Sequence, residues 1–314
     1  MLRLLIRRML ALVPLLLLIT IGTFLLARMI EGNPAQAIAG DGATQQEIDA
    51  VAKKLHLDDP MPVRYVRWLG DVASGDLGTS VATGRPVATE LARKLPVTAS
   101  LAVSALVLIF VIGIPLGIAQ GMRPGSRTDR LLLGGVSLGL ATPNFLIATL
   151  GVYLLAVRWK WLPALGYVSI FDNPWEFFRH MIMPAMSLAI VGGCELSRQL
   201  RSGLIGVANQ DYIRSARARG LSPLRVVGKH SLKNAFMPAL TILGVRVGSL
   251  LAGSVIIEQI FQLNGLGSYT LQAIQNKDFT VVQGVVLAMA VIVVLTNLLV
   301  DLAYSWLNPK VRVA

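Results

Sequence analysis

Residues 211–238 read DYIRSARARGLSPLRVVGKHSLKNAFMP, and the organisation of the chain can be worked out from this stretch outward. Its one acidic residue, Asp211, stands against the basic residues Arg214, Arg217, Arg219, Arg225, Lys229 and Lys233. Apolar runs long enough to cross a bilayer flank it on both sides. A basic segment between two spans is typical of a cytoplasmic loop. The sequence therefore predicts a membrane protein built around this inner loop.

The loop is predicted to fold as two short helices with a break between them. Gly220 can end the first helix in a left-handed conformation, and Ser222 followed by Pro223 suits the start of the second. Apolar and basic residues then alternate, which favours a compact amphipathic knob that docks into a partner's groove. We predict that this knob couples the chain to an ATPase. The break is assigned to Gly220, the helix start to Ser222 and Pro223, and the contact to Leu224, Arg225 and Val226, with Leu221 included in the coupling set.

The composition supports a membrane protein. The chain has 314 residues, of which 54% are hydrophobic and 15% charged, with a mean hydropathy of +0.64. That is too apolar for an ordinary soluble domain. The net charge of +12 lies mainly in alternate loops, as an orientation signal does, so nucleic-acid binding is not expected. The single cysteine, Cys194, lies in an apolar segment and excludes a disulfide framework.

Six apolar stretches are predicted to span the membrane. The first is too long for the apolar core of a signal peptide, so it is expected to be retained. Basic residues before the first span, in alternate loops and after the last span place both termini in the cytoplasm. The fold class is thus an all-α integral membrane protein with six transmembrane helices, a small external cap and a cytoplasmic coupling helix. The spans are Met9–Ile30, Ser100–Ala119, Leu131–Val157, Met181–Leu196, Met237–Ile257 and Val281–Leu302.

Three regions are expected along the chain. Residues 1–30 form the cytoplasmic N-terminus and first span, residues 31–96 an external segment, and residues 97–314 a five-helix core with the coupling loop at 203–238. The external segment has a helix-like pattern over Thr44–Leu55 and a turn-rich stretch at Gly75–Ser80. It is expected to be an ordered cap that holds a subunit interface or receives a delivery protein. A folded external loop without such a role is the alternative.

A few polar residues fall within the predicted spans, where charges usually face a bundle interior or a cavity. Arg246 lies deepest and has no evident partner in the sequence, so it is the main candidate for a pathway residue that reads a substrate carboxylate. Glu195 is expected to pair with Arg198 on the same helix face. Asp301 is assigned to a salt bridge or an interfacial position. The predicted pathway residues are Arg246, Asn144 and Glu258.

Two further features concern the third and fourth spans. Thr142-Pro143-Asn144 lies in the middle of the third span, where the proline predicts a kink, and either a structural kink or pore lining accounts for it. Trp175, Phe177 and Phe178 precede the fourth span and predict a separate amphipathic piece on the outer surface.

The motifs of common enzymes are not found in the sequence. It contains no GxxxxGK[ST] phosphate loop, HExxH or GxSxG motif, and its three histidines lie in separate segments. The chain is therefore not expected to be an enzyme or to bind a cofactor or metal itself.

Several motifs together resemble the B-type permease subunit of bacterial ATP-binding-cassette importers of the dipeptide, oligopeptide and nickel group, nearly end to end. The inner loop, from Asp211 to Leu221 and on to Pro238, is similar to this group's version of the EAA loop. Arg214-Ser215-Ala216 stand where the general pattern has Glu-Ala-Ala, a departure shared by the peptide branch. A second motif runs from Glu258-Gln259-Ile260-Phe261 through Gly265-Leu266-Gly267 to Asp278, with Asn264 and Thr280 in place of the usual prolines.

The resemblance implies a bacterial cytoplasmic-membrane importer of peptides. It implies as partners a second homologous permease, two cytoplasmic ATP-binding subunits that hold ATP and Mg, an external substrate-binding protein and membrane lipid, without nucleic acid. Nickel, glutathione or another small solute on the same scaffold is an alternative substrate. A stand-alone secondary transporter is the alternative of another class, although the inverted repeats it predicts are not evident.

Overall fold

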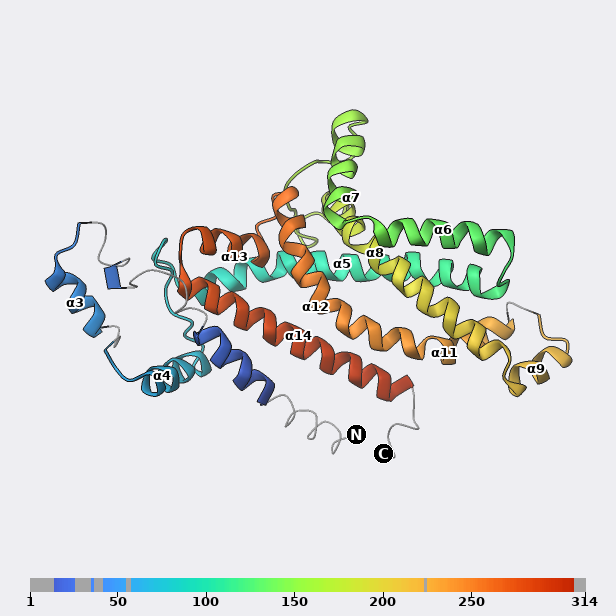
Figure 1. The fold of residues 1–314 in the computed structure, drawn as a ribbon. Helices are drawn as coiled ribbons and strands as arrows, with labels where there is room; N and C mark the ends of the chain where they lie inside the picture. The colour runs from blue at the N-terminus through green and yellow to red at the C-terminus, as the bar shows by residue number, and fades with distance from the viewer. Residues whose placement is uncertain (1–13, 26–34, 37–41, 55–57, 223–224, 308–314) are drawn as a thin grey trace. The chain divides into compact units, whose positions relative to one another are not determined.

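The computed structural model describes residues 14–25, 35–36, 42–54, 58–222 and 225–307. These residues are mostly helical, and they contain one isolated β-bridge, between Thr79 and Pro86. An all-α fold is therefore confirmed for the described part of the chain (Figure 1). Besides a helix at Pro14–Leu25, the elements are α3 (Gln45–Lys54), α4 (Met61–Ala73), α5 (Val87–Met122), α6 (Arg127–Ala141), α7 (Asn144–Gly151), the π-helix η1 (Val152–Arg158), α8 (Pro174–Ala208), α9 (Asp211–Ala218), the π-helix η2 (Val226–Ser231), α11 (Leu232–Ala235), α12 (Met237–Ile260), α13 (Leu266–Gln275) and α14 (Phe279–Leu307).

Several of these helices are long and apolar enough to cross a membrane. Among the described residues, α5, α8 and the Phe279–Val300 part of α14 qualify singly, and a fourth span is possible if the bent pair at Arg127–Ala141 and Asn144–Arg158 is one crossing. Pro14–Leu25 and Gly248–Ile260 are shorter apolar helices within or overlapping the first and fifth predicted spans. A multi-pass helical membrane protein is thus supported by length and composition.

The third predicted span is not one kinked helix. It consists of α6 and a second helical segment, α7 with η1, and the two segments meet at a bend of 97°. Pro143 has no N–H to donate, and the preceding residue, Thr142, is extended with ψ 122°, as residues before proline usually are. The Thr142 hydroxyl donates to the Leu138 carbonyl oxygen at 2.7 Å, which satisfies one of the carbonyls left free where α6 ends. The proline therefore separates two helices.

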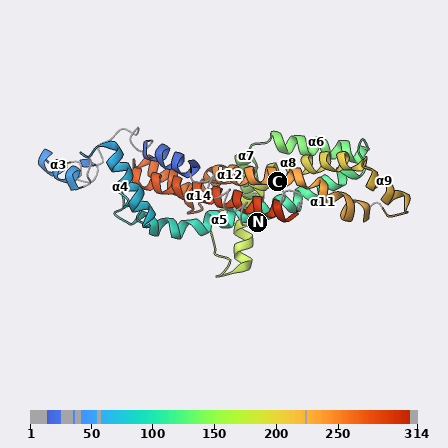
Figure 2. The same cartoon turned by 90° about the horizontal axis from the view of Figure 1, so that it is seen from below.

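The helix that contains the fourth predicted span is much longer than expected. α8 has 35 residues and extends beyond Met181–Leu196 at both ends. Asn173 caps its start, accepting hydrogen bonds from the backbone N–H groups of Trp175 and Glu176 at 3.1 and 3.2 Å. Trp175 and its aromatic neighbours therefore belong to the first turns of α8 and do not form a separate surface piece. α8 packs against α6, α7, α11 and α12 (Figures 1 and 2).

The chain divides into two compact units, Met1–Pro96 with Tyr269–Val294 and Val97–Ser268 with Leu295–Ala314. In the second unit, α5 approaches α8 through glycines that recur every fourth residue. A methyl group on any of them would lie 2.7 to 2.8 Å from a leucine side chain of α8. Small residues at this spacing let helix backbones come close within membranes. The pairs are Gly113 with Leu196, Gly117 with Leu200, and Gly121 with Leu204.

The first unit contains the described part of the predicted external segment. The helix predicted at Thr44–Leu55 is confirmed as α3. The ring of Tyr65 in α4 lies 5.5 Å from that of Phe24, in an edge-on arrangement. Asp278 accepts hydrogen bonds from the Ser80 hydroxyl and the Ala82 N–H, so the turn after Gly75 is fastened beside the start of α14. The described part of this segment is thus ordered by contacts distant in sequence.

Candidate coupling site and intramembrane polar residues

The predicted break in the inner loop is present. α9 ends at Ala218, and Gly220 has φ 75°, in the left-handed region that favours glycine. Its N–H donates to the Arg217 carbonyl oxygen at 2.9 Å. Leu221 and Ser222 follow without regular structure, while Pro223 and Leu224 lie outside the described residues. The helix–break prediction is therefore confirmed at Gly220.

After the break, the second helical part of the inner loop is described from Arg225 onward and continues as η2 and α11. The Val226 N–H donates to the Ser222 carbonyl oxygen at 3.0 Å, which places Ser222 at the start of this turn. Arg225 is exposed, as predicted for a contact residue. Val226 is not: it is buried against Ile213 and Ala216 of α9. The apolar side of this turn thus packs on α9, and Arg225 stays exposed.

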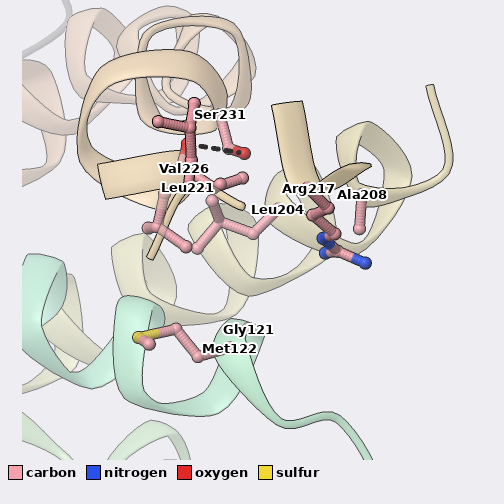
Figure 3. A pocket seen from close by; sticks show the side chains of 9 residues that line it. Gly121, Met122, Leu204, Ala208, Arg217, Leu221, Val226 and Ser231 are labelled. Carbon is pink, nitrogen blue, oxygen red and sulfur yellow. Dashed lines mark hydrogen bonds between the residues drawn. The ribbon is translucent and has the colours of Figure 1, made fainter. Parts of the chain in front are cut away.

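A cavity of about 270 Å³ lies beneath the knob. Figure 3 shows side chains from the end of α5 on one side and side chains of the knob on the other. The Ser231 hydroxyl, in this wall, donates to the Val226 carbonyl oxygen at 3.3 Å. The cavity is lined by Gly121, Met122, Leu204, Ala208, Arg217, Leu221, Val226, Val227 and Ser231.

The knob is joined closely to the inner end of α8. Gly203 of α8 lies against the backbone of Ala235 in α11, leaving no room for a side chain. Ala235 packs in a small apolar cluster with Leu200 and Leu204. Displacement of α11 would therefore be transmitted directly to α8.

An ion pair that the sequence analysis did not find fixes the same end of α8 to α6. Arg201 donates to both carboxylate oxygens of Asp129, at 2.8 and 2.7 Å, and Asp129 is 1% exposed. Asp129 also accepts from the Gly125 N–H, while its own N–H donates to the Ser126 hydroxyl oxygen. The available signal was the Ser126-x-x-Asp129 spacing, which is typical of a helix start.

The predicted local pair between Glu195 and Arg198 is not formed. Glu195 instead pairs with Arg246, across from α8 to α12, and Arg198 is exposed. The side chains of Glu195 and Arg246 are 27% and 22% exposed. Arg246 was expected to be unpaired, so this is also a correction for Arg246. Each charge neutralises the other at a depth where a lone charge is unfavourable.

Asn144 opens α7, directly after the bend at Pro143. Its amide nitrogen lies 3.7 Å from the position of a methyl group built on Gly253 of α12. Its amide oxygen is buried and accepts no hydrogen bond from the part of the chain that the structure describes. Asn144 thus brings an unused acceptor to the contact between α7 and α12.

Glu258 is completely buried at the end of α12. Its carboxylate accepts from the Thr98 hydroxyl at 2.7 Å and from the Ser268 N–H at 2.8 Å. The Thr98 oxygen in turn accepts from the Leu266 N–H, and a methyl group on Gly265 would collide with both Thr98 and Glu258. Glu258 therefore holds the loop between α12 and α13, and it does not face an open pathway in this structure.

The described residues contain no group of three or more His, Cys, Asp or Glu residues placed to hold a metal ion.

These features describe a helical membrane protein with a basic loop, broken at Gly220, between two of its helices, as transport permeases have. The chain belongs to the family of inner membrane components of binding-protein-dependent transport systems. The main model of this family matches residues 113–313, and the model of its N-terminal part matches residues 1–102.

Curated relatives cover nearly the whole chain. It is 36% identical over 306 residues to a probable peptide ABC transporter permease, y4tP, of Sinorhizobium fredii, covering 98% of each chain. It is 36% identical to the dipeptide permease DppB of Alkalihalophilus pseudofirmus and to the oligopeptide permease AppB of Bacillus subtilis, again with 98% of each chain covered. A chain of the inward-facing MetNI methionine ABC transporter matches with a TM-score of 0.57 and 19% identity, over 69% of this chain and 96% of that one. The last match supports the fold.

Proposed function

We propose that this chain is a pore-forming subunit of an ATP-driven importer that moves peptides across the bacterial cytoplasmic membrane. The observation that carries the proposal is the near full-length similarity to permeases named for peptides, dipeptides and oligopeptides. The chain would cross the membrane six times, with both termini in the cytoplasm, and would work with a second homologous permease and an external substrate-binding protein. Two separate ATPase subunits would bind ATP and Mg.

The inner loop is proposed to receive the ATPase. Its set of coupling residues is Gly220, Leu221, Ser222, Pro223, Leu224, Arg225 and Val226, within which the buried Val226 holds the knob together and the exposed Arg225 makes contact. The left-handed Gly220 and the tight Gly203–Ala235 contact support this role. Because the knob is connected rigidly to α8 and borders a cavity, closure of its socket would tilt α8 and α12 and switch the side from which the pathway is open.

The proposal is tested by ATP-dependent uptake of labelled di- and oligopeptides into vesicles that contain the chain with its partner subunits and the delivery protein. Native complex should accumulate peptide, and the double variant Leu224→Asp/Arg225→Asp should assemble but not transport. Arg127→Asp, an exposed basic residue of another predicted inner loop, is the matched control and should transport normally. Uptake of nickel chelates without uptake of any peptide by the native complex would reject the peptide assignment.

A further inference from the structure

The Glu195–Arg246 ion pair joins the two helices between which the inner loop runs. α8 leads into the loop and α12 leaves it, so any motion of the knob changes how these helices face each other. Both side chains are partly exposed, so neither is locked in a closed core. In a membrane environment, two such charges cannot separate freely, because each would lose its partner without water to replace it.

A zwitterionic ligand can replace both partners at once. A peptide with free termini carries an ammonium group that can pair with Glu195. It also carries a carboxylate that can accept two hydrogen bonds from the guanidinium of Arg246. A solute with one charge, or none, leaves at least one of the two side chains unpaired. The fully extended backbone of a dipeptide spans about 7 Å, so the pair has to open by about that distance to admit one. The pair itself thus selects for the ligand that can open it.

Asn144 adds a third polar group along the same contact. It lies beside Gly253, seven residues after Arg246 on α12, and Gly253 in turn lies beside Leu188, seven residues before Glu195 on α8. Seven residues are close to two helical turns, so the groups share one helix face at a separation of about 10 Å along the axis. The unused acceptor of Asn144 is suited to a backbone N–H of a peptide.

We propose that Glu195, Arg246 and Asn144 form a transient binding site for peptides with free termini, available when α8 and α12 move apart. Glu195 binds the α-ammonium group, Arg246 the α-carboxylate, and Asn144 accepts from an amide N–H of peptides that extend far enough. This site rests on the proposed peptide transport and deepens it, because it assigns recognition within the membrane to this chain in addition to the delivery protein.

The site is tested directly on the assembled complex in lipid nanodiscs, without the delivery protein. A dipeptide with a diazirine side chain is prepared with free termini, with an acetylated amino end, with an amidated carboxyl end, and with both ends blocked. Crosslinks to α8 and α12 are measured by mass spectrometry in nucleotide-free and vanadate-trapped states. We expect the free peptide to label these helices about tenfold more than the doubly blocked one, because the blocked peptide leaves both charges without a partner.

Each neutral variant should lose the labelling preference for one free end of the peptide. Glu195→Gln should remove the discrimination against the acetylated peptide, and Arg246→Gln the discrimination against the amidated one. Arg198→Gln, which removes an exposed charge from the same helix, is the matched control and should keep the native preference. Should the single variants fail to assemble, the exchange Glu195→Arg/Arg246→Glu keeps a pair and is expected to restore labelling by the free peptide.

Two results would overturn the site. One is equal loss of labelling by all four peptides in the variants, which is what a purely structural ion pair predicts. The other is no labelling of α8 or α12 in the native complex. Uptake by native vesicles with the delivery protein separates this outcome from failure of the proposed function: transport without labelling rejects the site alone, whereas absent peptide transport rejects the function.

Discussion

The contact between Gly203 and Ala235 allows a sharp prediction from a single methyl group. In Gly203→Ala, the new Cβ would lie 3.1 Å from both the carbonyl carbon and the Cα of Ala235, and closer still to its oxygen. These are backbone atoms, which cannot rotate away as a side chain can. Three residues later on the same helix, Gly206 has no atom within 4 Å of its Cβ position, so Gly206→Ala is a matched control.

The two substitutions are expected to change the stability of the protein in opposite directions. Alanine stabilises a helix interior by roughly 0.5–1 kcal/mol relative to glycine. That gain stands alone in Gly206→Ala. In Gly203→Ala it is opposed by a cost of about 1–3 kcal/mol for overpacking, so the net change is a loss of up to about 2.5 kcal/mol unless α11 moves. If α11 moves, the knob is displaced and coupling suffers.

The assay measures both results on the purified complex: apparent thermal stability by fluorescence-detected size exclusion, and the number of ATP molecules hydrolysed per peptide transported. Gly203→Ala should be less stable or need more ATP per peptide than native complex. Gly206→Ala should match or exceed the native stability with unchanged coupling. Equal stability and equal coupling of the two variants would refute the close contact between α8 and α11 as described.

Three further predictions concern other parts of the chain. Gly220→Val forces a β-branched residue to φ 75° at a cost of about 1–3 kcal/mol and should abolish transport with normal membrane insertion, whereas Gly220→Asn should retain transport because asparagine tolerates that conformation; comparable uptake by both would count against the break. Arg201→Ala leaves the buried Asp129 carboxylate without its main partner and should lower stability by about 3 kcal/mol, whereas the exposed Arg198→Ala should change it by less than about 0.5 kcal/mol, as thermal denaturation of the two would show. A cysteine at the exposed Ala82 should react with an impermeant maleimide in intact cells, and reaction only after lysis would invert the proposed orientation.

Local features of the fold were predictable from the sequence. Gly220 indicates a helix end because few other residues adopt its left-handed conformation. The helical pattern over Thr44–Leu55 is confirmed as α3. The limits of α8 were missed because its apolar run ends at polar residues on both sides. The helix continues past them, since Asn173 caps its start and the ion pair of Arg201 stabilises its inner end.

Contacts between helices were the less predictable part. Glu195 was paired with Arg198 because only neighbours on one helix can be compared in a sequence, whereas its partner, Arg246, is 51 residues away, on another helix. Val226 was assigned to the contact with an ATPase because an apolar residue in an exposed loop suggests a docking surface. Its burial depends on how α9 folds back, which the spacing of residues does not reveal.

The unbroken course of α8 has a mechanical consequence. A helix of 35 residues is about 52 Å long, so a rigid tilt of about 5° about one end displaces the other by about 4–5 Å. Under the proposed coupling, α8 would act as a lever that starts at the knob. Pro184, ten residues from its start, cannot donate the backbone hydrogen bond of its turn, so α8 resists bending least at this point. Substitutions there should change the length of the stroke without touching either end.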